Sequence, residues 1–203
     1  MKFYTKNPIV DGITRTDIIN HFVNKRDGVE YLEIGVNEGT NFQSIACENK
    51  VGVDPSPTSA STLKITSDKF FESNDKKFDV IFVDGLHTAV QVYKDISNAL
   101  LCLKDDGVIV CHDMNPLSLN AQAVPRRQKL WNGDCWVAWV WLRATRDDVE
   151  MVVLDTDHGC GIIRKGRQTP VRIDSNITYD HLKKNRVEWL NLKPSIYLNK
   201  LDW

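Results

Sequence analysis

The sequence has little of what marks several protein classes. Only 11 of its 203 residues are glycine and 7 are proline, which excludes a collagenous, low-complexity or wholly disordered chain. The five cysteines form no CxxC pair or other close metal spacing, so reduced and mostly buried thiols are expected. The longest strongly apolar run, VAWVWL (137–142), is far too short to span a bilayer, and the first residues lack the apolar core of a signal peptide. A cytoplasmic protein is therefore predicted.

Charge of one sign is also missing. There are 26 Lys and Arg against 27 Asp and Glu, a net charge of -1, so no overall field draws the protein to nucleic acid or to an anionic membrane. Neither is predicted as a partner. Hydrophobic residues make up 42% of the chain, enough for a sizeable core. Because no linker or repeat divides the chain, one domain over 1–203 is predicted, with its core at about 14–166 and a C-terminal helical extension at about 170–203.

What is present is an alternation of apolar runs and helical patterns. Strands are predicted at 31–35, 50–54, 63–68, 78–84 and 107–113, and helices at 14–27, 40–48, 88–103, 134–146 and 178–192. The segments 149–157 and 159–166 predict a closing β-hairpin. Alternating strands and helices indicate an α/β fold, Rossmann-like and doubly wound around a mostly parallel sheet.

Polar residues follow the predicted strands, and in a parallel sheet these ends share one edge, where ligands bind. Glu33, Gly35 and Gly39 form a glycine turn after the first strand, but GVNEGTNF does not supply the GxGxxG of nicotinamide-binding proteins, and no GxxxxGK[ST] occurs. Among nucleotide-like ligands, a nucleoside cofactor without a pyrophosphate is therefore the remaining candidate. Asp54 ends the second strand, where its carboxylate can accept hydrogen bonds from both ribose hydroxyls.

Four segments taken together carry a family resemblance. YLEIGVNEG (31–39), VGVDPSP (51–57), FDVIFVDGLH (78–87) and DDGVIVCHD (105–113) resemble the successive motifs of class I S-adenosylmethionine-dependent methyltransferases. The resemblance implies a single-domain, seven-stranded sheet whose last strand is antiparallel. It also implies that the cofactor's methionine part binds Glu33, Gly35 and Gly39, its ribose binds Asp54, and its adenine edge binds Ser67 and Asp68.

The DGLH segment resembles a narrower group, the metal-dependent O-methyltransferases of sugars and related natural products, such as macrocin O-methyltransferase. That resemblance implies Asp84 and Asp113 as ligands of a divalent ion, with His112 as a further candidate and His87 as the base. Asp84 also lies at the predicted cofactor edge. Oxygen ligands favour Mg²⁺, and a metal that chelates a hydroxyl helps the base to form the alkoxide.

The aromatic segment WNGDCWVAWVWLR (131–143) offers acceptor contacts. Trp131, Asp134 and Trp136 are predicted to meet the sugar, glycan or glycosylated small molecule that accepts the methyl group. The basic stretch 125–129 is interpreted as a solvated loop, with an anionic group on the acceptor as an alternative. Self-association remains open.

Three other functions compete with this prediction. A metal-independent methyltransferase is the nearest, and a noncatalytic scaffold with the same fold is a second. Nucleic-acid methylation is disfavoured, since the sequence has neither an Asn/Asp-Pro-Pro-aromatic motif nor a basic stripe.

Overall fold

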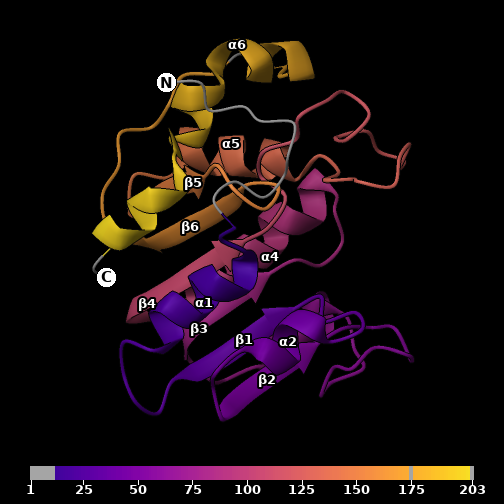
Figure 1. Cartoon of the computed structure of the whole chain (residues 1–203), viewed down its shortest axis with the longest axis vertical. Coiled ribbons are helices and arrows are strands. Elements are labelled where there is room, and N and C mark those ends of the chain that lie inside the picture. Colours follow the sequence, from indigo (N-terminus) through magenta and orange to yellow (C-terminus); the bar gives the residue numbers. More distant parts are fainter. Residues whose placement is uncertain (1–11, 174–175, 202–203) are drawn as a thin grey trace.

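A seven-stranded sheet forms the centre of the computed structural model, which describes residues 12–173 and 176–201 (Figure 1). The ends of the predicted 1–203 domain, including the last two residues of its C-terminal extension, lie outside these ranges. The strand order is β2-β1-β3-β4-β6-β5-β7. The strands are β1 (Glu30–Ile34), β2 (Asn49–Val53), β3 (Phe78–Val83), β4 (Leu103–Cys111), β5 (Val149–Leu154), β6 (Cys160–Lys165) and β7 (Leu192–Lys193).

Only one strand runs against the rest. β6 is antiparallel to both of its neighbours, β4 and β5, while the other pairs are parallel. The predicted α/β fold, with a mostly parallel sheet of seven strands and an antiparallel strand from the closing hairpin, is confirmed. The seventh strand, however, is β7 from the C-terminal region.

The strand predicted at 63–68 is wrong. Of these residues only Leu63 pairs, in an isolated bridge with Val53, and helix α3 (Ser67–Ser73) begins before the segment ends. Thr66 is the N-cap of this helix, and its side chain accepts a hydrogen bond from the Lys69 amide. The Thr-Ser-Asp sequence thus acts as a helix start, which prevails over the β-branched residues before it.

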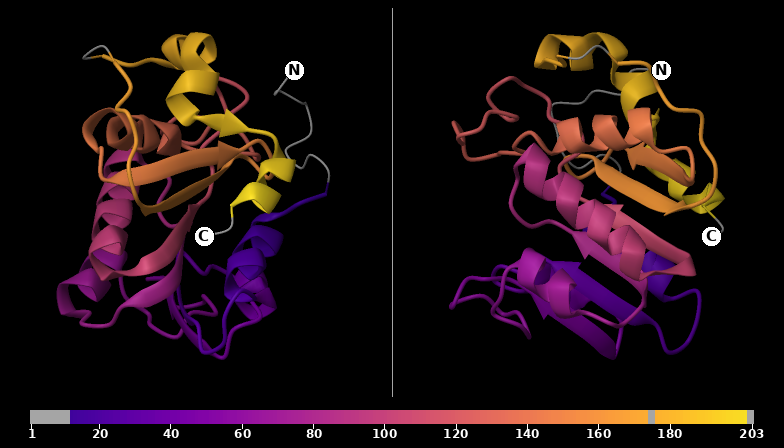
Figure 2. Two further views of the ribbon diagram at one scale, coloured as in Figure 1. Left: turned by 90° about the vertical axis from the view of Figure 1, so that its left-hand side faces the viewer. Right: turned by 180° about the vertical axis from the view of Figure 1, so that it is seen from behind.

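Helices cover both faces of the sheet. In the left view of Figure 2, α4 (Ala89–Cys102) and α5 (Cys135–Thr145) lie on one side and α1 (Arg15–Val23) on the other. The remaining helices are α2 (Thr40–Ser44), α6 (Tyr179–Leu190) and the 3₁₀ helix η1 (Ser195–Lys200). Because successive side chains of a strand point to opposite faces, Ile81 and Val83 of β3 join the core beneath α4 and α5, while Val80 and Phe82 join the core beneath α1. This explains why β3 is a continuous apolar run.

The first helix is fixed by its cap. The Thr14 side chain and Asp17 form a capping box, in which the Asp17 carboxylate accepts from the Thr14 amide at 2.8 Å. Ile18, Ile19 and Phe22 then face the sheet and are buried. This arrangement places Arg15, the first residue of the helix, at the carboxyl edge of the strands.

The carboxyl ends of the parallel strands are in register. Ile34 pairs with Val53 and Val83, and Val83 pairs with Cys111, so these strands stop at one level. The residues that follow them therefore meet along one edge. β5 ends there too, since it runs parallel to this set, and its turn into β6 contributes Asp157.

Candidate functional site

A cavity of about 600 Å³ opens at this edge. The loops after β1, β2 and β3, the start of α3 and the first turn of α4 surround it. Among the predicted cofactor residues, its lining includes Gly35, Asp54, Ser67, Asp68 and Asp84, and the predicted base His87 lines it as well.

Gly35 allows two loops to touch. Its φ is +90°, and a Cβ at this position would clash with the carbonyl oxygen of Asp84 and with Gly85. Only glycine fits such a close approach at a positive φ without strain. The loops after β1 and β3 can therefore form one continuous wall of the cavity.

Asp54 is held in a fixed orientation. Its Oδ2 accepts from the Asn37 amide and its Oδ1 from the Ser56 amide, both at 2.8 Å. Each carboxylate oxygen has further lone pairs, so Asp54 can still accept hydrogen bonds from a ligand in the cavity. Asn37, which the sequence reasoning missed, lines the cavity at φ +49°.

Gln91 organises the opposite wall. Its Nε2 lies 3.2 Å from Ser67 Oγ, 3.0 Å from Asp68 Oδ1 and 3.0 Å from Asp95 Oδ1. Burial raises the pKa of Asp95, whose Oδ2 has no hydrogen-bond partner among the described residues. Gln91 was not predicted, although its place in the first turn of the helix after the DGLH segment puts it at the same edge as His87.

Two predicted cofactor residues do not line the cavity. Glu33 is buried, and its Oε2 accepts from Tyr31 Oη at 2.5 Å and from Asn41 Nδ2 at 2.8 Å. Burial raises the pKa of Glu33 to about 7, although both hydrogen bonds oppose this shift. Gly39 has φ +85° and faces Ala60 and Gln43. Both residues support the glycine turn from behind, and their contact with a cofactor remains a prediction.

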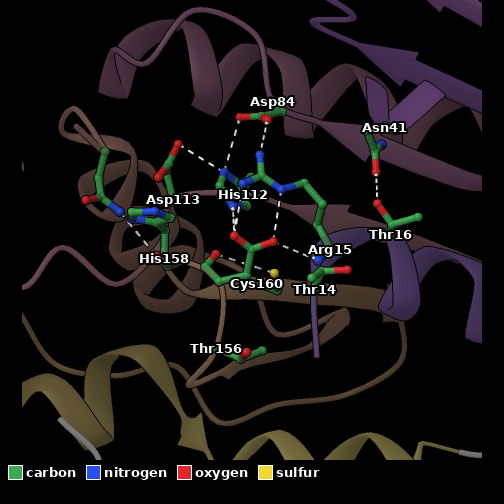
Figure 3. A network of polar contacts seen from close by, with 12 residues as sticks. Thr14, Arg15, Thr16, Asn41, Asp84, His112, Asp113, Thr156, His158 and Cys160 are labelled. Atoms are coloured by element: carbon green, nitrogen blue, oxygen red, sulfur yellow. Dashed lines mark hydrogen bonds and ion pairs between the residues drawn. The ribbon is translucent and has the colours of Figure 1, made fainter. Parts of the chain in front are cut away.

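Beside the cavity, carboxylates and imidazoles converge (Figure 3). His87 Nε2 lies 3.2 Å from Asp84 Oδ1, and His87 Nδ1 lies 3.3 Å from Asp113 Oδ2. His112 Nδ1 lies 3.1 Å from Asp113 Oδ2 and 3.5 Å from Asp84 Oδ1. Asp113 has φ +67°, which turns its carboxylate back toward this group. The three predicted metal ligands and the predicted base are therefore neighbours.

Electrostatics within this cluster shift both kinds of group. Burial disfavours ionisation of Asp84, but the charge and hydrogen bonds of His112 and His87 prevail and lower its pKa. Burial likewise opposes protonation of His87, but the hydrogen bond to Asp84 and the charges of Asp113 and Asp84 raise its pKa. The pKa of His112 is raised well above its ordinary value, again against burial, by Asp113 and Asp84. A histidine held in this way keeps its proton to a higher pH than free histidine.

Arg15 closes the cluster from α1 (Figure 3). Its Nη1 donates to Asp84 Oδ2 at 3.0 Å, while its Nη2 and Nε donate to the two oxygens of Asp157 at 2.9 and 3.0 Å. The Arg15 backbone amide also donates to Asp157, and His112 Nε2 lies 3.3 Å from Asp157 Oδ1. No sequence pattern pointed to Arg15, because only the fold brings the start of the first helix to the strand ends.

The acceptor residues fall into different places. Trp131 is half-buried and stacks on His87, with ring centroids 5.1 Å apart and an interplanar angle of 23°. Asp134 Oδ1 accepts from the Ala89 amide at 2.6 Å and so satisfies the start of α4. Trp136 is 1% exposed and packs in the core, with its indole nitrogen donating to Gln122. Of the three, only Trp131 touches a residue of the cavity with its ring.

Residues 32–114, less than half of the chain, match a family model described as a methyltransferase domain. That match confirms the predicted enzyme class, a methyltransferase. No protein of curated function matches the sequence.

Several solved structures share the fold. A Podospora anserina methyltransferase bound to SAH has a TM-score of 0.57 and 18% identity, over 75% of this chain and 78% of its own. A candidate caffeoyl-CoA O-methyltransferase of Staphylococcus aureus has a TM-score of 0.59 and 19% identity, over 79% and 87%. A candidate O-methyltransferase of Klebsiella pneumoniae has a TM-score of 0.55 and 12% identity, over 77% and 82%. At such identities the likeness establishes the fold.

No helix among the described residues has both the length and the apolar character needed to cross a membrane.

Proposed function

We propose that the protein is an S-adenosylmethionine-dependent O-methyltransferase that methylates a hydroxyl of a sugar, glycan or glycosylated small molecule. The proposal rests on the position of His87 at the end of the cavity. A cavity lined by Gly35, Asp54 and Asp68 is bounded at one end by His87, which is held between Asp84 and Asp113. A cofactor site and a base therefore share one space, as methyl transfer requires.

The cavity wall supports S-adenosylmethionine as the cofactor. In this proposal Asp54 accepts hydrogen bonds from the ribose hydroxyls, and Ser67 and Asp68 meet the adenine. Gly35 lets the methionine part approach the backbone. Asp84 lies where the cavity meets the acid and histidine cluster, so the sulfonium end points toward His87. The nearby carboxylates would stabilise the positive charge of the sulfonium.

His87 acts as the general base. The acceptor hydroxyl gives its proton to an imidazole nitrogen of His87, and its oxygen attacks the sulfonium methyl carbon. The carbon–sulfur bond breaks, sulfur keeps the electron pair, and S-adenosylhomocysteine leaves. Asp84 and Asp113 stabilise the imidazolium that forms, while the Trp131 ring fixes the plane of the imidazole.

The residues present fit a divalent metal. Ligand atoms of Asp84, His87 and Asp113 lie within 4.8 Å of one another. The Nδ1 atoms of His87 and His112 are buried without a hydrogen-bond partner among the described residues, although both face Asp113. Asp84 and Asp113, with His112, would hold the ion, and when bound it would stabilise the acceptor alkoxide. Carboxylates alone would favour Mg²⁺, whereas an imidazole ligand also suits transition metals such as Zn²⁺ or Fe²⁺.

Arg15 favours a second candidate, a metal-independent methyltransferase. Its guanidinium already pairs with Asp84 Oδ2 at 3.0 Å. A fixed cation at this carboxylate provides part of the positive charge that a metal would bring. In this second candidate function His87 performs the same proton transfer, and Asp84 orients the imidazole.

Calorimetry with two variants tests the proposal. The wild type should bind S-adenosylmethionine, and Asp54→Ala should weaken this binding. His87→Ala should bind the cofactor normally but lose about 100- to 10,000-fold in turnover, the usual effect of removing a general base. Repeating the titrations and the turnover assay with Mg²⁺, Mn²⁺ or chelator separates the two candidates. Failure of the wild type to bind the cofactor under every condition would contradict both and favour a scaffold.

A further inference from the structure

The segment between β4 and α5 forms a loop that packs directly against His87. Gly133, at φ +63°, lies so close that a Cβ would clash with the His87 carbonyl oxygen, and Trp131 stacks on the His87 ring. The Asn132 and Gly133 amides both donate to the Ala121 carbonyl, which closes the neck of the loop. Residues 121–133, called here the acceptor loop, are thus tied at both ends beside the base.

The far part of the acceptor loop projects from the molecule. In Figure 1 and in the right view of Figure 2 it extends from the same side as the loop after β2, which borders the cavity. Val124 and Leu130 on this loop are 48% and 58% exposed, and Leu86, which lines the cavity, is 61% exposed. The acceptor loop and the rim of the cavity therefore both expose apolar side chains.

Three cations lie on the same loop. Arg126, Arg127 and Lys129 are exposed, and no ion pair joins any of them to a carboxylate of the described residues. The Arg126 guanidinium lies over the Trp131 ring, 5.6 Å from Cζ to the centroid, and donates to the carbonyls of Gln128 and Lys129. Arg126 is thereby held in place by its own loop, with its charge one indole ring away from His87.

We infer that the acceptor is a hydroxylated molecule with an anionic group, a carboxylate or a phosphate, which Arg126 binds while His87 takes the hydroxyl proton. The Nε and Nη2 hydrogen bonds to Gln128 and Lys129 do not use the Nη1 donors of Arg126, which suit either anion. His87 and Arg126 both contact the Trp131 ring, so the reacting hydroxyl and the anion of one acceptor would bind at separate positions around this indole.

This inference rests on the proposed function, and matched acceptor pairs test it. Methyl transfer from labelled S-adenosylmethionine is measured with glucuronate against glucuronamide, 3,4-dihydroxybenzoate against its amide, and glucose 6-phosphate against glucose. We expect kcat/KM to be at least about tenfold higher for the anionic member of a pair. The difference should come from a lower KM for that member. The carboxylate and phosphate pairs tell the two anions apart. The preference should weaken as salt is raised.

Variants assign the preference to Arg126. Arg126→Gln should abolish the preference for the anionic member, and Arg126→Lys should restore part of it. If Arg126 only shaped the loop, the Arg126→Lys and Arg126→Gln variants would lose the preference for the anionic member equally. Arg167→Gln is the matched control, because Arg167 is an exposed arginine whose guanidinium pairs with Asp147 instead.

Two results would overturn the inference. One is an equal kcat/KM for both members of every pair in the wild type, or no transfer to any anionic member. The other is a preference that survives Arg126→Gln. Calorimetry with S-adenosylhomocysteine separates these from failure of the proposed function. If the cofactor product binds while the anionic acceptors fail, only the acceptor class is wrong.

Discussion

Glu33 offers a test of the structure through stability alone. The carboxyl is 1% exposed, and burial raises its pKa to about 7. An acid whose pKa is higher in the folded than in the unfolded state stabilises the fold at low pH, where it is protonated in both. This advantage is lost as pH rises from the ordinary value near 4.5 through the folded pKa. Glu33→Gln removes the titration and keeps an oxygen for Tyr31 and Asn41.

The magnitude follows from the two pKa values. Between pH 5 and pH 8.5, the difference in proton binding amounts to about 2.5 kcal/mol. Urea unfolding of the wild type and of Glu33→Gln at the two pH values measures it. Relative to the wild type, the variant should be more stable at pH 8.5 than at pH 5 by about that amount.

Glu38→Gln is the control, since Glu38 is an exposed glutamate of the same turn. Its effect on the free energy of unfolding should be small at both pH values. A Glu33→Gln effect that is the same at both pH values, or more destabilising at the higher one, would refute the burial argument.

Three other substitutions have defined outcomes. Thr14→Ala removes the capping box of α1 and should lower the free energy of unfolding by about 1 kcal/mol in chemical denaturation. Gly133→Ala forces a Cβ against the His87 carbonyl at a positive φ, so it should lower kcat with little change in cofactor affinity by calorimetry. Arg15→Met removes the guanidinium that pairs with Asp84 and Asp157 and should cost about 2 kcal/mol at pH 7. Since the pKa of Asp157 is lowered in the fold against burial, by His112 and Arg15, this cost should shrink as pH falls toward 3.

The sequence predicted the features that depend on local pattern. The apolar runs of β1 to β4 set both the sheet and the level at which its strands end, so Gly35, Asp54 and Asp84 could be placed at one edge. The DGLH spacing then put His87 beside Asp84, because a turn separates the strand from the next helix. These assignments need only the chain direction and the fact that the strands are parallel.

Other features could not be predicted because they depend on side-chain direction or on distant contacts. Glu33 lies two residues from Tyr31, so the strand period points both to the same face, and they bond to each other behind the turn. Trp136 belongs to a helix that is buried on most of its surface. Neither Arg15 nor Asp157 could be assigned to the cluster, since they are 142 residues apart and meet only when α1 packs on the sheet.

The position of Arg15 also limits how the cluster can work. Asp84 gives one oxygen, Oδ2, to Arg15 and turns the other, Oδ1, toward His87 and His112. A carboxylate divided in this way can offer a metal only one oxygen while the arginine stays. Asp113, in contrast, faces both imidazoles with Oδ2, and no arginine of residues 12–173 or 176–201 forms an ion pair with it. A metal bound here while Arg15 stays could therefore take only Oδ1 from Asp84, whereas the Asp113 carboxylate is not shared with an arginine of the described residues.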